Sequence, residues 1–182
     1  VSGIISKEYK RGVAGVNFDN VRIEVDATVL VAPGNLEDGF GVDCRIQDNG
    51  DGYGFRIGSD GMAEIVLFSD GESIALYEWT ESAAVRVNGA TNHITAICEG
   101  SHLSLLVNDE FVAEVVDDTF STGDLALSAI SYSDDPVEVL FDDIIVQSIG
   151  NAYEYEDGEM YPVNIINTSG YEVCVLYITS PI

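Results

Sequence analysis

The sequence predicts an all-β protein, a two-sheet antiparallel β-sandwich followed by a C-terminal β-hairpin extension. Three observations lead to this fold class. Short stretches of alternating apolar and polar residues recur along the chain, Gly/Asn/Asp clusters separate them about every 8–12 residues, and no segment sustains a helical period. This spacing is typical of sandwiches, whereas a parallel sheet would need helical segments between its strands.

The clearest strand pattern lies between residues 39 and 61. Two alternating strands, Phe40–Gln47 and Tyr53–Ile57, flank a loop rich in Gly, Asn and Asp, and a second turn over Gly58–Gly61 follows at once. This order predicts a β-meander. In the longest alternating run, Arg22–Ala32, apolar residues at odd positions face one way and polar residues face the other. Such alternation predicts strands with one face in a core.

The remaining predicted strands have the same pattern and the same turn residues. They are 3–9, Met62–Ser69, Ser73–Trp79, His93–Glu99, Ser101–Asn108, Glu110–Val116, Asp124–Ser131 and Val137–Gln147. The segment 10–20, between the first of these strands and the long alternating run, is predicted to be a link.

The pattern changes near residue 150, which predicts three parts. We expect the sandwich over residues 1–149, an acidic linker over 150–161 and the hairpin extension over 162–182. An isolated two-stranded hairpin is marginal at best. The extension must therefore pack on its own sandwich, pair with another copy of the chain, or begin a further domain. The residues expected to make such a contact are Val163, Ile165, Val173, Val175 and Tyr177.

The charge of the chain is extreme, with 7 basic and 32 acidic residues and a formal net charge of −25. Every Lys and Arg lies at or before Arg86. Such a surface repels nucleic acids and anionic membranes, because phosphate binding needs clustered cations. It suits Ca²⁺, which prefers carboxylate and carbonyl oxygens, and it equally suits a secreted protein that the charge merely keeps soluble. No apolar run approaches the ~20 residues of a membrane span.

Three cysteines offer one pairing that the strand pattern favours. Cys44 shares a strand face with Phe40 and Val42, and Cys98 shares one with Ile94. Both therefore face inward, which suits a core disulfide between distant strands, although two buried thiols would fit the same pattern. A disulfide would place the protein outside the cytoplasm, and the absence of Met at position 1 fits a processed, exported chain or a trimmed one.

Several short motifs occur in an order that resembles concanavalin A-like jelly-roll modules, especially the laminin-G-like modules of bacterial extracellular proteins. The motifs are Gly39–Arg45, Tyr53–Ile57, Leu76–Ser82, Asn92–Ile94, Cys98–Gly100, Leu103–Asn108, Gly123–Leu127 and Phe141–Asp143. The resemblance covers roughly residues 18–147 and implies a jelly-roll sandwich. It implies less about function, because this fold serves lectins, glycosidases, adhesion modules and spacers alike.

The resemblance also implies a place for calcium. In such modules an acidic residue on the last strand helps to hold a structural Ca²⁺ near the N-terminal segment. Asp142 or Asp143, together with Asp19, would do so here. The loop 47–52 is acidic as well, but it lacks an EF-hand ligand at its twelfth position, Gly58, and is expected to be a turn.

We do not expect an enzyme. A chain resembling the glycosidases of this fold would have a strand with an E-x-D-x-E or E-x-D-x-x-E pattern. Here Glu24 and Asp26 supply the first two acids, but Thr28 and Val29 stand where the second Glu is expected. Retaining hydrolysis needs two carboxyl groups about 5–5.5 Å apart. The nucleophile-elbow, Walker and dinucleotide motifs are also missing.

Two functions remain as hypotheses. The first is a non-catalytic extracellular structural or adhesion module that self-associates, with the C-terminal strands inserted into a neighbouring subunit to build a head-to-tail filament. The alternative is a carbohydrate-binding module of a secreted or cell-surface protein. Its partner would be an extracellular polysaccharide, and its binding residues are predicted to be Arg45, Tyr53, Tyr77 and Trp79.

Overall fold

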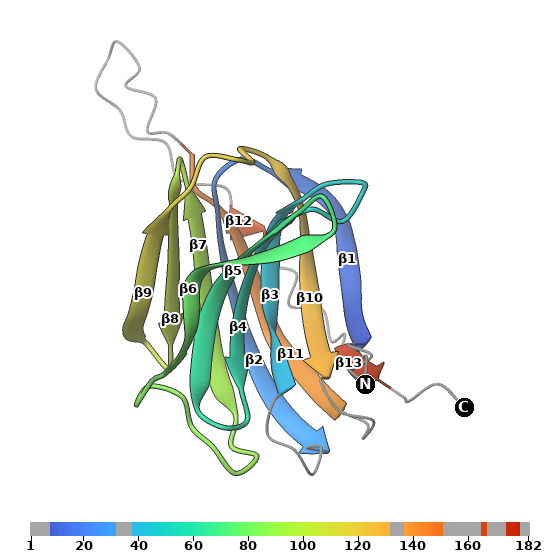
Figure 1. Ribbon diagram of the computed structural model, residues 1–182, viewed down its shortest axis with the longest axis vertical. Helices are drawn as coiled ribbons and strands as arrows, with labels where there is room; N and C mark the ends of the chain where they lie inside the picture. The colour runs from blue at the N-terminus through green and yellow to red at the C-terminus, as the bar shows by residue number, and fades with distance from the viewer. Residues whose placement is uncertain (1–7, 32–37, 132–136, 151–164, 167–173, 179–182) are drawn as a thin grey trace, which may run out of the picture.

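The computed structural model describes residues 8–31, 38–131, 137–150, 165–166 and 174–178. These residues form two antiparallel sheets that pack face to face, so the predicted all-β sandwich is confirmed (Figure 1). In order across sheet A, the strands are β1 (Glu8–Phe18), β10 (Gly123–Ser131), β3 (Asp38–Ile46), β4 (Gly52–Gly58), β5 (Met62–Ser69) and β6 (Glu72–Glu81).

Sheet B contains the other strands. In order they are β12 (Ile165–Ile166), β11 (Val137–Ser148), β2 (Val21–Val31), β7 (Asn92–Glu99), β8 (His102–Val107) and β9 (Glu110–Val116), and β13 (Cys174–Ile178) also pairs with β11. Consecutive strands β3–β6 form a meander in sheet A, and its first two strands are those of the meander predicted over residues 39–61. Strands β7–β9 form a second meander in sheet B.

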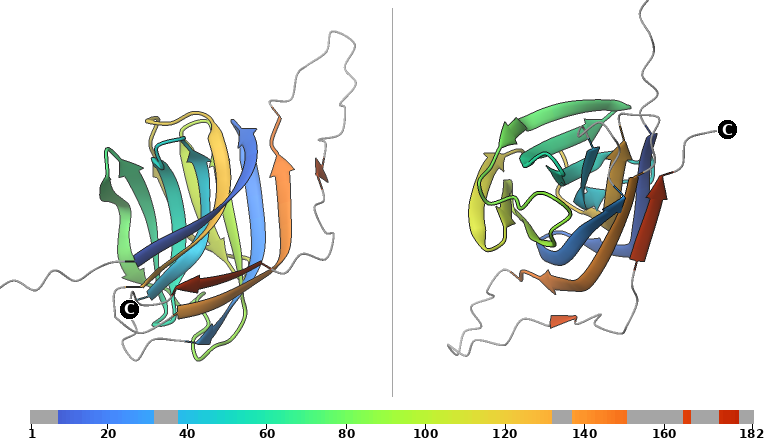
Figure 2. Two further views of the ribbon diagram at one scale, coloured as in Figure 1. Left: turned by 90° about the vertical axis from the view of Figure 1, so that its right-hand side faces the viewer. Right: turned by 90° about the horizontal axis from the view of Figure 1, so that it is seen from below.

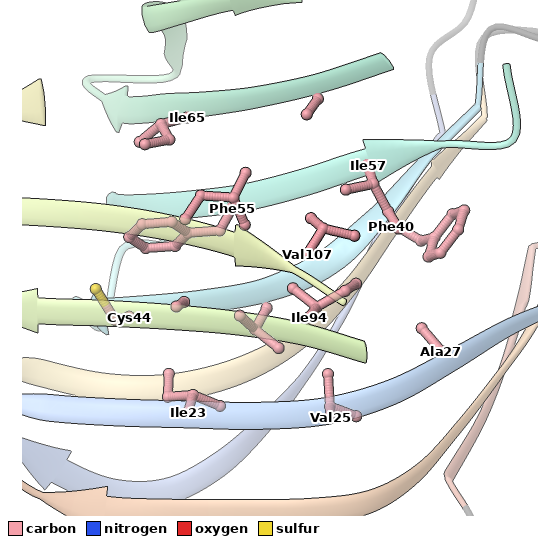
Figure 3. Packing of buried hydrophobic residues seen from close by; sticks show 14 of the residues in the cluster. Ile23, Val25, Ala27, Phe40, Cys44, Phe55, Ile57, Ile65, Ile94 and Val107 are labelled. Atoms are coloured by element: carbon pink, nitrogen blue, oxygen red, sulfur yellow. The ribbon is translucent and has the colours of Figure 1, made fainter. Parts of the chain in front are cut away.

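The core lies between the sheets and is built from the inward positions of the alternating strands. The apolar residues Ile23, Val25, Ala27 and Val29 of β2 are buried as predicted. They face Phe55 and Ile57 of β4 in the other sheet and lie beside Ile94 of β7 in their own sheet (Figure 3). A disulfide between Cys44 on β3 and Cys98 on β7 crosses this core with an S–S distance of 2.01 Å. The predicted pairing is therefore confirmed, and it joins the two sheets covalently.

Strand β1 differs from the prediction. A strand over 3–9 and a link over 10–20 were expected, yet β1 covers Glu8–Phe18 and pairs with β10. The pairing is interrupted by a bulge at Gly15, which has φ of 78°. The carboxylate of Asp124 accepts hydrogen bonds from the backbone N–H groups of Gly15 and Val16, at 2.9 and 3.0 Å. Because this carboxylate is far away in the sequence, the local pattern could not show that it supports a strand here.

The C-terminal strands lie on the free edge of β11. Strand β13 pairs with Val137–Phe141, and β12 pairs with Val146 and Gln147. The right-hand view of Figure 2 shows β13 beside both β11 and β1, where it lies across the open side of the sandwich. Ile165, Val175 and Tyr177 thus belong to strands paired within their own chain. The other two expected contact residues, Val163 and Val173, lie outside the described residues.

Removing the disulfide should destabilise the sandwich. The double variant Cys44→Ala/Cys98→Ala opens a link across a sequence separation of 54 residues, and we expect it to lose about 2–4 kcal/mol of unfolding free energy. Urea denaturation followed by far-UV circular dichroism measures this loss. Cys174→Ala keeps the cross-link and is the control; an unchanged midpoint in the double variant would contradict the prediction.

Candidate functional site

The outward positions of the two central strands of sheet A are unusually rich in glycine. Along β3 these positions are Gly39, Gly41 and Asp43, and along β4 they are Gly54, Arg56 and Gly58. We call these six residues the glycine face. Both β3 and β4 are buried along their whole length, whereas a simple sandwich strand would expose every second residue. Glycine in a strand interior often marks a place where another group approaches closely.

Side chains from the neighbouring strands close over the glycine face. A Cβ atom at Gly54 would lie 3.0 Å from atoms of Asp43, Val66 and Phe68. A Cβ atom at Gly58 would lie 2.5 Å from Trp79. The missing side chains therefore make room for a layer of polar and aromatic groups.

Sheet A curls over this face, so that side chains of β1 and β5 meet. Three strands separate β1 from β5, which in a flat sheet would be about 19 Å at ~4.8 Å per strand. The ring centroids of Tyr9 and Phe68 nevertheless lie 5.3 Å apart. The left-hand view of Figure 2 shows β1 running obliquely across its neighbours. The outer side of sheet A is therefore concave.

One arginine–carboxylate pair on this face is fully hydrogen-bonded. The Asp43 carboxylate is completely buried and accepts from Tyr9 Oη at 2.7 Å, Arg11 Nε at 2.7 Å and Ser128 Oγ at 2.9 Å. Arg11 also donates from Nη1 to the carbonyl oxygen of Gly50 at 2.7 Å and from Nη2 to Tyr9 Oη at 2.9 Å. Burial and the Asp43 charge raise the pKa of Tyr9, so its phenol stays protonated and keeps donating.

A second pair lies beside the first. Arg56 Nη2 is 2.6 Å from Glu64 Oε1 on the adjacent strand. The guanidinium carbons of Arg11 and Arg56 lie 5.1 and 5.4 Å from the ring centroid of Phe68. Both distances are within the range of a cation–π contact.

Trp79 borders the same face at its other end. Its ring packs against Gly39 and Gly58, and its indole Nε1 donates to Asp60 Oδ2 at 3.4 Å. Trp79 and Asp60 are partly exposed, whereas Arg56 is 2% exposed.

An open hollow of about 560 Å³ lies at the rim of the sandwich, between the β3–β4 loop and the start of β10. Its walls present amides, carboxylates, a hydroxyl and one aromatic ring; they are Asn17, Ile46, Gln47, Asp48, Asn49, Asp51, Phe120, Thr122 and Gly123. We call this the rim hollow. Arg11 connects it to the glycine face, because Gly50 belongs to the same β3–β4 loop. Its volume is within the ~300–1,000 Å³ of small-ligand sites.

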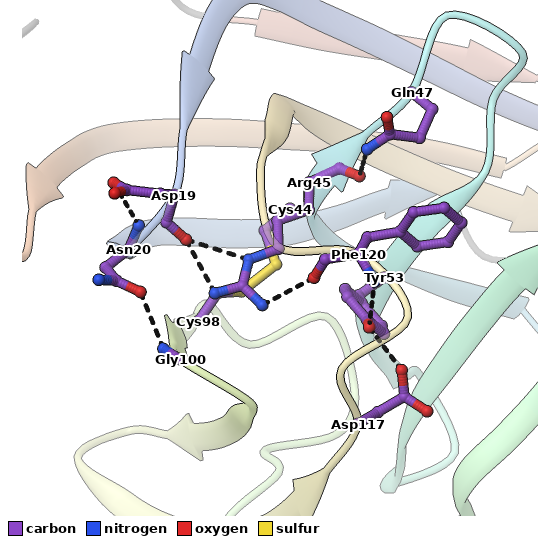
Figure 4. Close-up of a disulfide and its surroundings, with 10 residues drawn as sticks. All are labelled: Asp19, Asn20, Cys44, Arg45, Gln47, Tyr53, Cys98, Gly100, Asp117 and Phe120. Carbon is purple, nitrogen blue, oxygen red and sulfur yellow. Dashed lines mark hydrogen bonds between the residues drawn. A yellow bond between two sulfur atoms is a disulfide. The ribbon is translucent and has the colours of Figure 1, made fainter.

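The walls of the rim hollow are fixed by a network around the disulfide (Figure 4). Arg45 donates to the carbonyl oxygens of Asp19, at 2.8 and 3.0 Å, and of Phe120, at 2.9 Å. Gln47 donates from Nε2 to the carbonyl oxygen of Thr122 at 2.7 Å. Tyr53 Oη donates to Asp117 Oδ1 at 2.5 Å and accepts from the Phe120 N–H at 3.0 Å. The loop 117–122 is thereby tied to β3 and β4.

The titration of this network follows from its burial. Burial raises the pKa of Tyr53 to about 12, and the hydrogen bond to Asp117 acts in the same direction. Partial burial would raise the pKa of Asp117, but hydrogen bonds from Tyr53 and Thr119 outweigh it and lower the pKa. Burial lowers the pKa of Arg45. The phenol therefore remains a donor at every physiological pH.

The prediction that Arg45 and Tyr53 contact a sugar is wrong, because both side chains are buried. Arg45 is 1% exposed and Tyr53 is 0% exposed. Arg45 has a left-handed backbone, with φ of 55°, so the strand alternation could not locate its side chain. Both residues instead support the loop that carries Phe120. Tyr77 packs partly against the core, and Trp79 keeps part of its surface open.

The predicted calcium ligands do not converge. Asp19 precedes β2, while Asp142 lies opposite Asp26, five residues into that strand. At ~3.3 Å per residue along β2, Asp19 and Asp142 are more than about 15 Å apart. Asp143 is adjacent to Asp142, so it is remote from Asp19 as well. This ligand set is therefore wrong. Within the described ranges, no group of three or more His, Cys, Asp or Glu side chains is placed to hold a metal. Calcium binding by this protein stays a prediction.

Glu24 and Asp26 lie on the outer side of sheet B, remote from the glycine face. Arg22 Nε donates to Glu24 Oε1, and His93 contacts both acids, with Nδ1 2.7 Å from Asp26 Oδ1 and Nε2 3.6 Å from Glu24 Oε2. These carboxylates are thus held by neighbouring basic side chains. Of the residues described, no helix is long and apolar enough to cross a membrane.

The fold is similar to several solved structures. A carbohydrate-binding module, CBM66 from Bacillus subtilis, matches with a TM-score of 0.63 and 18% identity, over 77% of this chain and 82% of that one. Sheep galectin-11, solved in complex with glycerol, matches with a TM-score of 0.54 and 12% identity, over 75% of this chain and 96% of that one. A functionally unknown protein from Saccharomyces cerevisiae matches with a TM-score of 0.52 and 17% identity, over 75% of this chain and 74% of that one.

These identities show the fold alone. No protein-family model and no curated protein matches the sequence. The architecture is therefore a jelly-roll-like β-sandwich of the kind found in lectins and carbohydrate-binding modules.

Sequence reasoning missed Arg11, Arg56 and Phe120. One signal could have found the arginine on β4: glycines at alternate positions, Gly39 and Gly41 on one strand and Gly54 and Gly58 on the next, mark an outward face that accommodates other groups. Phe120 had no comparable signal, because it lies in a loop whose position depends on Arg45 and Tyr53.

Tyr53→Phe should loosen the rim hollow. The variant leaves the Phe120 N–H without its acceptor, so we expect a loss of about 1–3 kcal/mol and faster amide hydrogen exchange over residues 117–122. The folded pKa of about 12 lies above the value of ~10 for a free phenol. The stability that this phenol contributes is therefore complete below pH ~10 and is lost as pH rises toward 12.

The measurement is urea denaturation from neutral to alkaline pH. Tyr77→Phe is the matched control, since it removes a phenol from β6 outside this network. If Tyr53→Phe and Tyr77→Phe shift the midpoint equally at neutral pH, the bracing role of Tyr53 is refuted.

Proposed function

We propose that this protein is a non-catalytic carbohydrate-binding module of the concanavalin A-like lectin superfamily, and that the rim hollow is its glycan-binding site. The observation that carries this proposal is the open hollow itself. It combines one aromatic ring with several amide and carboxylate groups, on a sandwich whose structural neighbours include a carbohydrate-binding module and a galectin.

The lining suits the chemistry of a sugar. Hydroxyl groups of a pyranose or furanose both donate and accept, so they pair with amides, which do the same, and with carboxylates, which only accept. Asn17, Asn49 and Asp48 offer these groups at the wall. The apolar side of a sugar ring can pack on Phe120, whose backbone is held by Arg45 and Tyr53. A preorganised wall reduces the entropy lost on binding.

Two further observations support a secreted, non-catalytic role. The Cys44–Cys98 disulfide fits an oxidising compartment outside the cytoplasm. Glu24 and Asp26, the acids that an E-x-D strand would supply to a glycosidase, are paired with Arg22 and His93.

Asp48→Asn should weaken glycan binding. Asp48 is exposed and lies in the wall of the hollow, so the variant removes an acceptor without disturbing the core. We expect about a tenfold loss of affinity, the loss of one hydrogen bond to a charged group. Affinity electrophoresis against neutral and acidic polysaccharides, with and without Ca²⁺, identifies the ligand, and calorimetry then measures its affinity.

Glu72→Gln is the control, because it removes one charge from the exposed start of β6. Binding that is lost equally in both variants would reflect overall charge and not the hollow. Failure of the unmodified protein to be retained on any polysaccharide would refute the proposed function.

Self-association through the C-terminal strands is the second candidate. The pairing of β13 with the edge of β11 could form equally between two copies, because main-chain hydrogen bonds do not distinguish a chain from its neighbour. Light scattering over a wide concentration range tests it. A mass that grows with concentration supports strand exchange, and a constant monomer mass excludes it.

A further inference from the structure

A second hollow lies at the end of the sandwich opposite the rim hollow. Its volume is about 480 Å³, and its walls come from the end of β2, the β4–β5 turn and the loop between β6 and β7. Figure 1 shows these segments at the lower end of the sandwich and the β3–β4 loop at the upper end. The lining includes Leu30, Ser59, Asp60, Val87 and Asn88. We call this the distal hollow, and the glycan site proposed above does not use it.

The loop that forms one wall of the distal hollow is held in place from two sides. The side-chain amide of Asn92, which is 2% exposed, accepts from the N–H of Arg86 and donates to its carbonyl oxygen, both at 2.8 Å. The N–H of Ser82 donates to the carbonyl oxygen of Gly61 at 3.0 Å and ties the same loop to the β4–β5 turn. The wall is therefore preorganised, which reduces the entropy that binding would cost.

The walls combine an aliphatic side with an acidic side. Leu30 and Val87 line the hollow and are 51% and 41% exposed. The partly exposed carboxylate of Asp60 accepts from the Met62 N–H at 3.1 Å and from Trp79 Nε1 at 3.4 Å, one hydrogen bond at each oxygen. Because a carboxylate has about four acceptor positions, Asp60 has capacity for a further donor from the hollow.

A second carboxylate lies directly behind this acidic wall. Asp38 is 0% exposed and lies on the core side of β3, two residues before Phe40. Its Oδ1 accepts from the hydroxyl of Ser59, a wall residue, whereas its Oδ2 is buried without a hydrogen-bond partner among the described residues. Burial raises the pKa of Asp38, and the charge of Asp60 acts in the same direction.

The position of Asp38 indicates a cation. A buried polar atom is nearly always hydrogen-bonded in a folded protein, and here an unpartnered carboxylate oxygen lies within the field of another carboxylate. Asp38 is too deeply buried to touch a ligand itself. A positive charge at Asp60 would nevertheless offset the repulsion between the two acids, so both contribute to binding although only Asp60 makes contact.

We propose that the distal hollow binds an alkylammonium group, with the ammonium at Asp60 and the aliphatic stem against Leu30 and Val87. Two sources carry this group, the lysine side chain of a partner protein and a free amine. An ammonium donates three hydrogen bonds, and its stem covers apolar surface. The inference does not depend on glycan binding, because it uses the opposite end of the sandwich.

Other ligands fit these walls less well. Calcium takes six to eight oxygen ligands and gains nothing from Leu30 or Val87. A neutral ligand would leave the two carboxyl groups uncompensated, and an anion would approach a chain with a net charge of −25. Arg86 lies in the same loop but outside the lining, and its Nη1 donates to the carbonyl oxygen of Thr91 at 3.5 Å.

Titration with n-butylamine tests the acidic side, and n-butanol is the uncharged probe of the same length. We expect butylamine to shift the amide NMR signals of residues 87–89 and to bind about tenfold more tightly than butanol. Asp60→Asn should reduce the affinity for butylamine about tenfold, and Asp38→Asn should reduce it less. Glu72→Gln, which removes one exposed charge from β6, should leave it unchanged. Urea midpoints confirm that each variant is folded.

Comparison of butylamine with methylamine tests the aliphatic side. Three additional methylene groups on Leu30 and Val87 should tighten binding about tenfold. In Leu30→Ser this preference should shrink while methylamine binds as before. An amine that merely neutralised a charged surface would show no such dependence on chain length.

The outcomes decide the inference and the source of the amine. Equal binding of butylamine and butanol, or unchanged binding in Asp60→Asn, would overturn the inference, as would Ca²⁺ that displaces butylamine from residues 87–89. If an acetylated and amidated Gly-Lys-Gly peptide binds at least as tightly as butylamine, the source is a protein lysine; if only butylamine binds, it is a free amine. A Gly-Arg-Gly peptide that binds more tightly than both would show that the alkylammonium group is wrong. None of these probes is a glycan, so the proposed function stands or falls separately.

Discussion

The buried guanidinium of Arg45, next to the Cys44–Cys98 disulfide, organises the end of the sandwich that carries the rim hollow. The disulfide joins β3 of one sheet to β7 of the other. Arg45, the residue after Cys44, has a left-handed backbone and donates hydrogen bonds to the carbonyl oxygens of Asp19 and Phe120. The guanidinium N–H groups of Arg45 thus supply hydrogen-bond donors to the backbone carbonyl oxygens of two irregular segments.

Glycine at one position makes this arrangement possible. A Cβ atom at Gly123 would lie 2.4 Å from the carbonyl carbon of Arg45, so only glycine lets the start of β10 approach so closely. Tyr53 then fixes the loop 117–122 from the side of β4. The shape of the hollow is therefore a consequence of contacts with the core.

The sequence predicts the fold well because the inward faces follow strict alternation. The period of a strand was enough to place Ile23, Val25, Ala27 and Val29 of β2 in the core, and to place Cys44 and Cys98 there as well. The candidate site is predicted less well, because it depends on departures from that period. The left-handed Arg45 changes the direction of a side chain, and the bulge at Gly15 makes a strand of an apparent link.

The outer side of sheet A is the clearest example of such a departure. Alternation assigns the positions of Gly39, Gly54 and Arg56 to solvent, and all three are buried. Curvature that brings Tyr9 and Phe68 together across three intervening strands is a property of the whole sheet, and no local pattern encodes it. The sugar contacts expected at Arg45 and Tyr53 failed for other reasons. Arg45 has a left-handed backbone and bonds the carbonyl oxygens of Asp19 and Phe120. Tyr53 lies on the core side of β4, the side that it shares with Phe55 and Ile57.

The location of the arginines changes what the net charge of −25 means. Arg11 and Arg56 are paired with acids inside the concave face, Arg22 is paired with Glu24, and Arg45 is sealed against backbone carbonyls. Four of the seven basic residues are thus engaged with acids or carbonyl oxygens of the same chain. A polyanion would be repelled at a distance before any guanidinium could meet it. An uncharged polymer meets no such long-range repulsion and can form short-range hydrogen bonds with the amide and carboxylate groups that line the rim hollow.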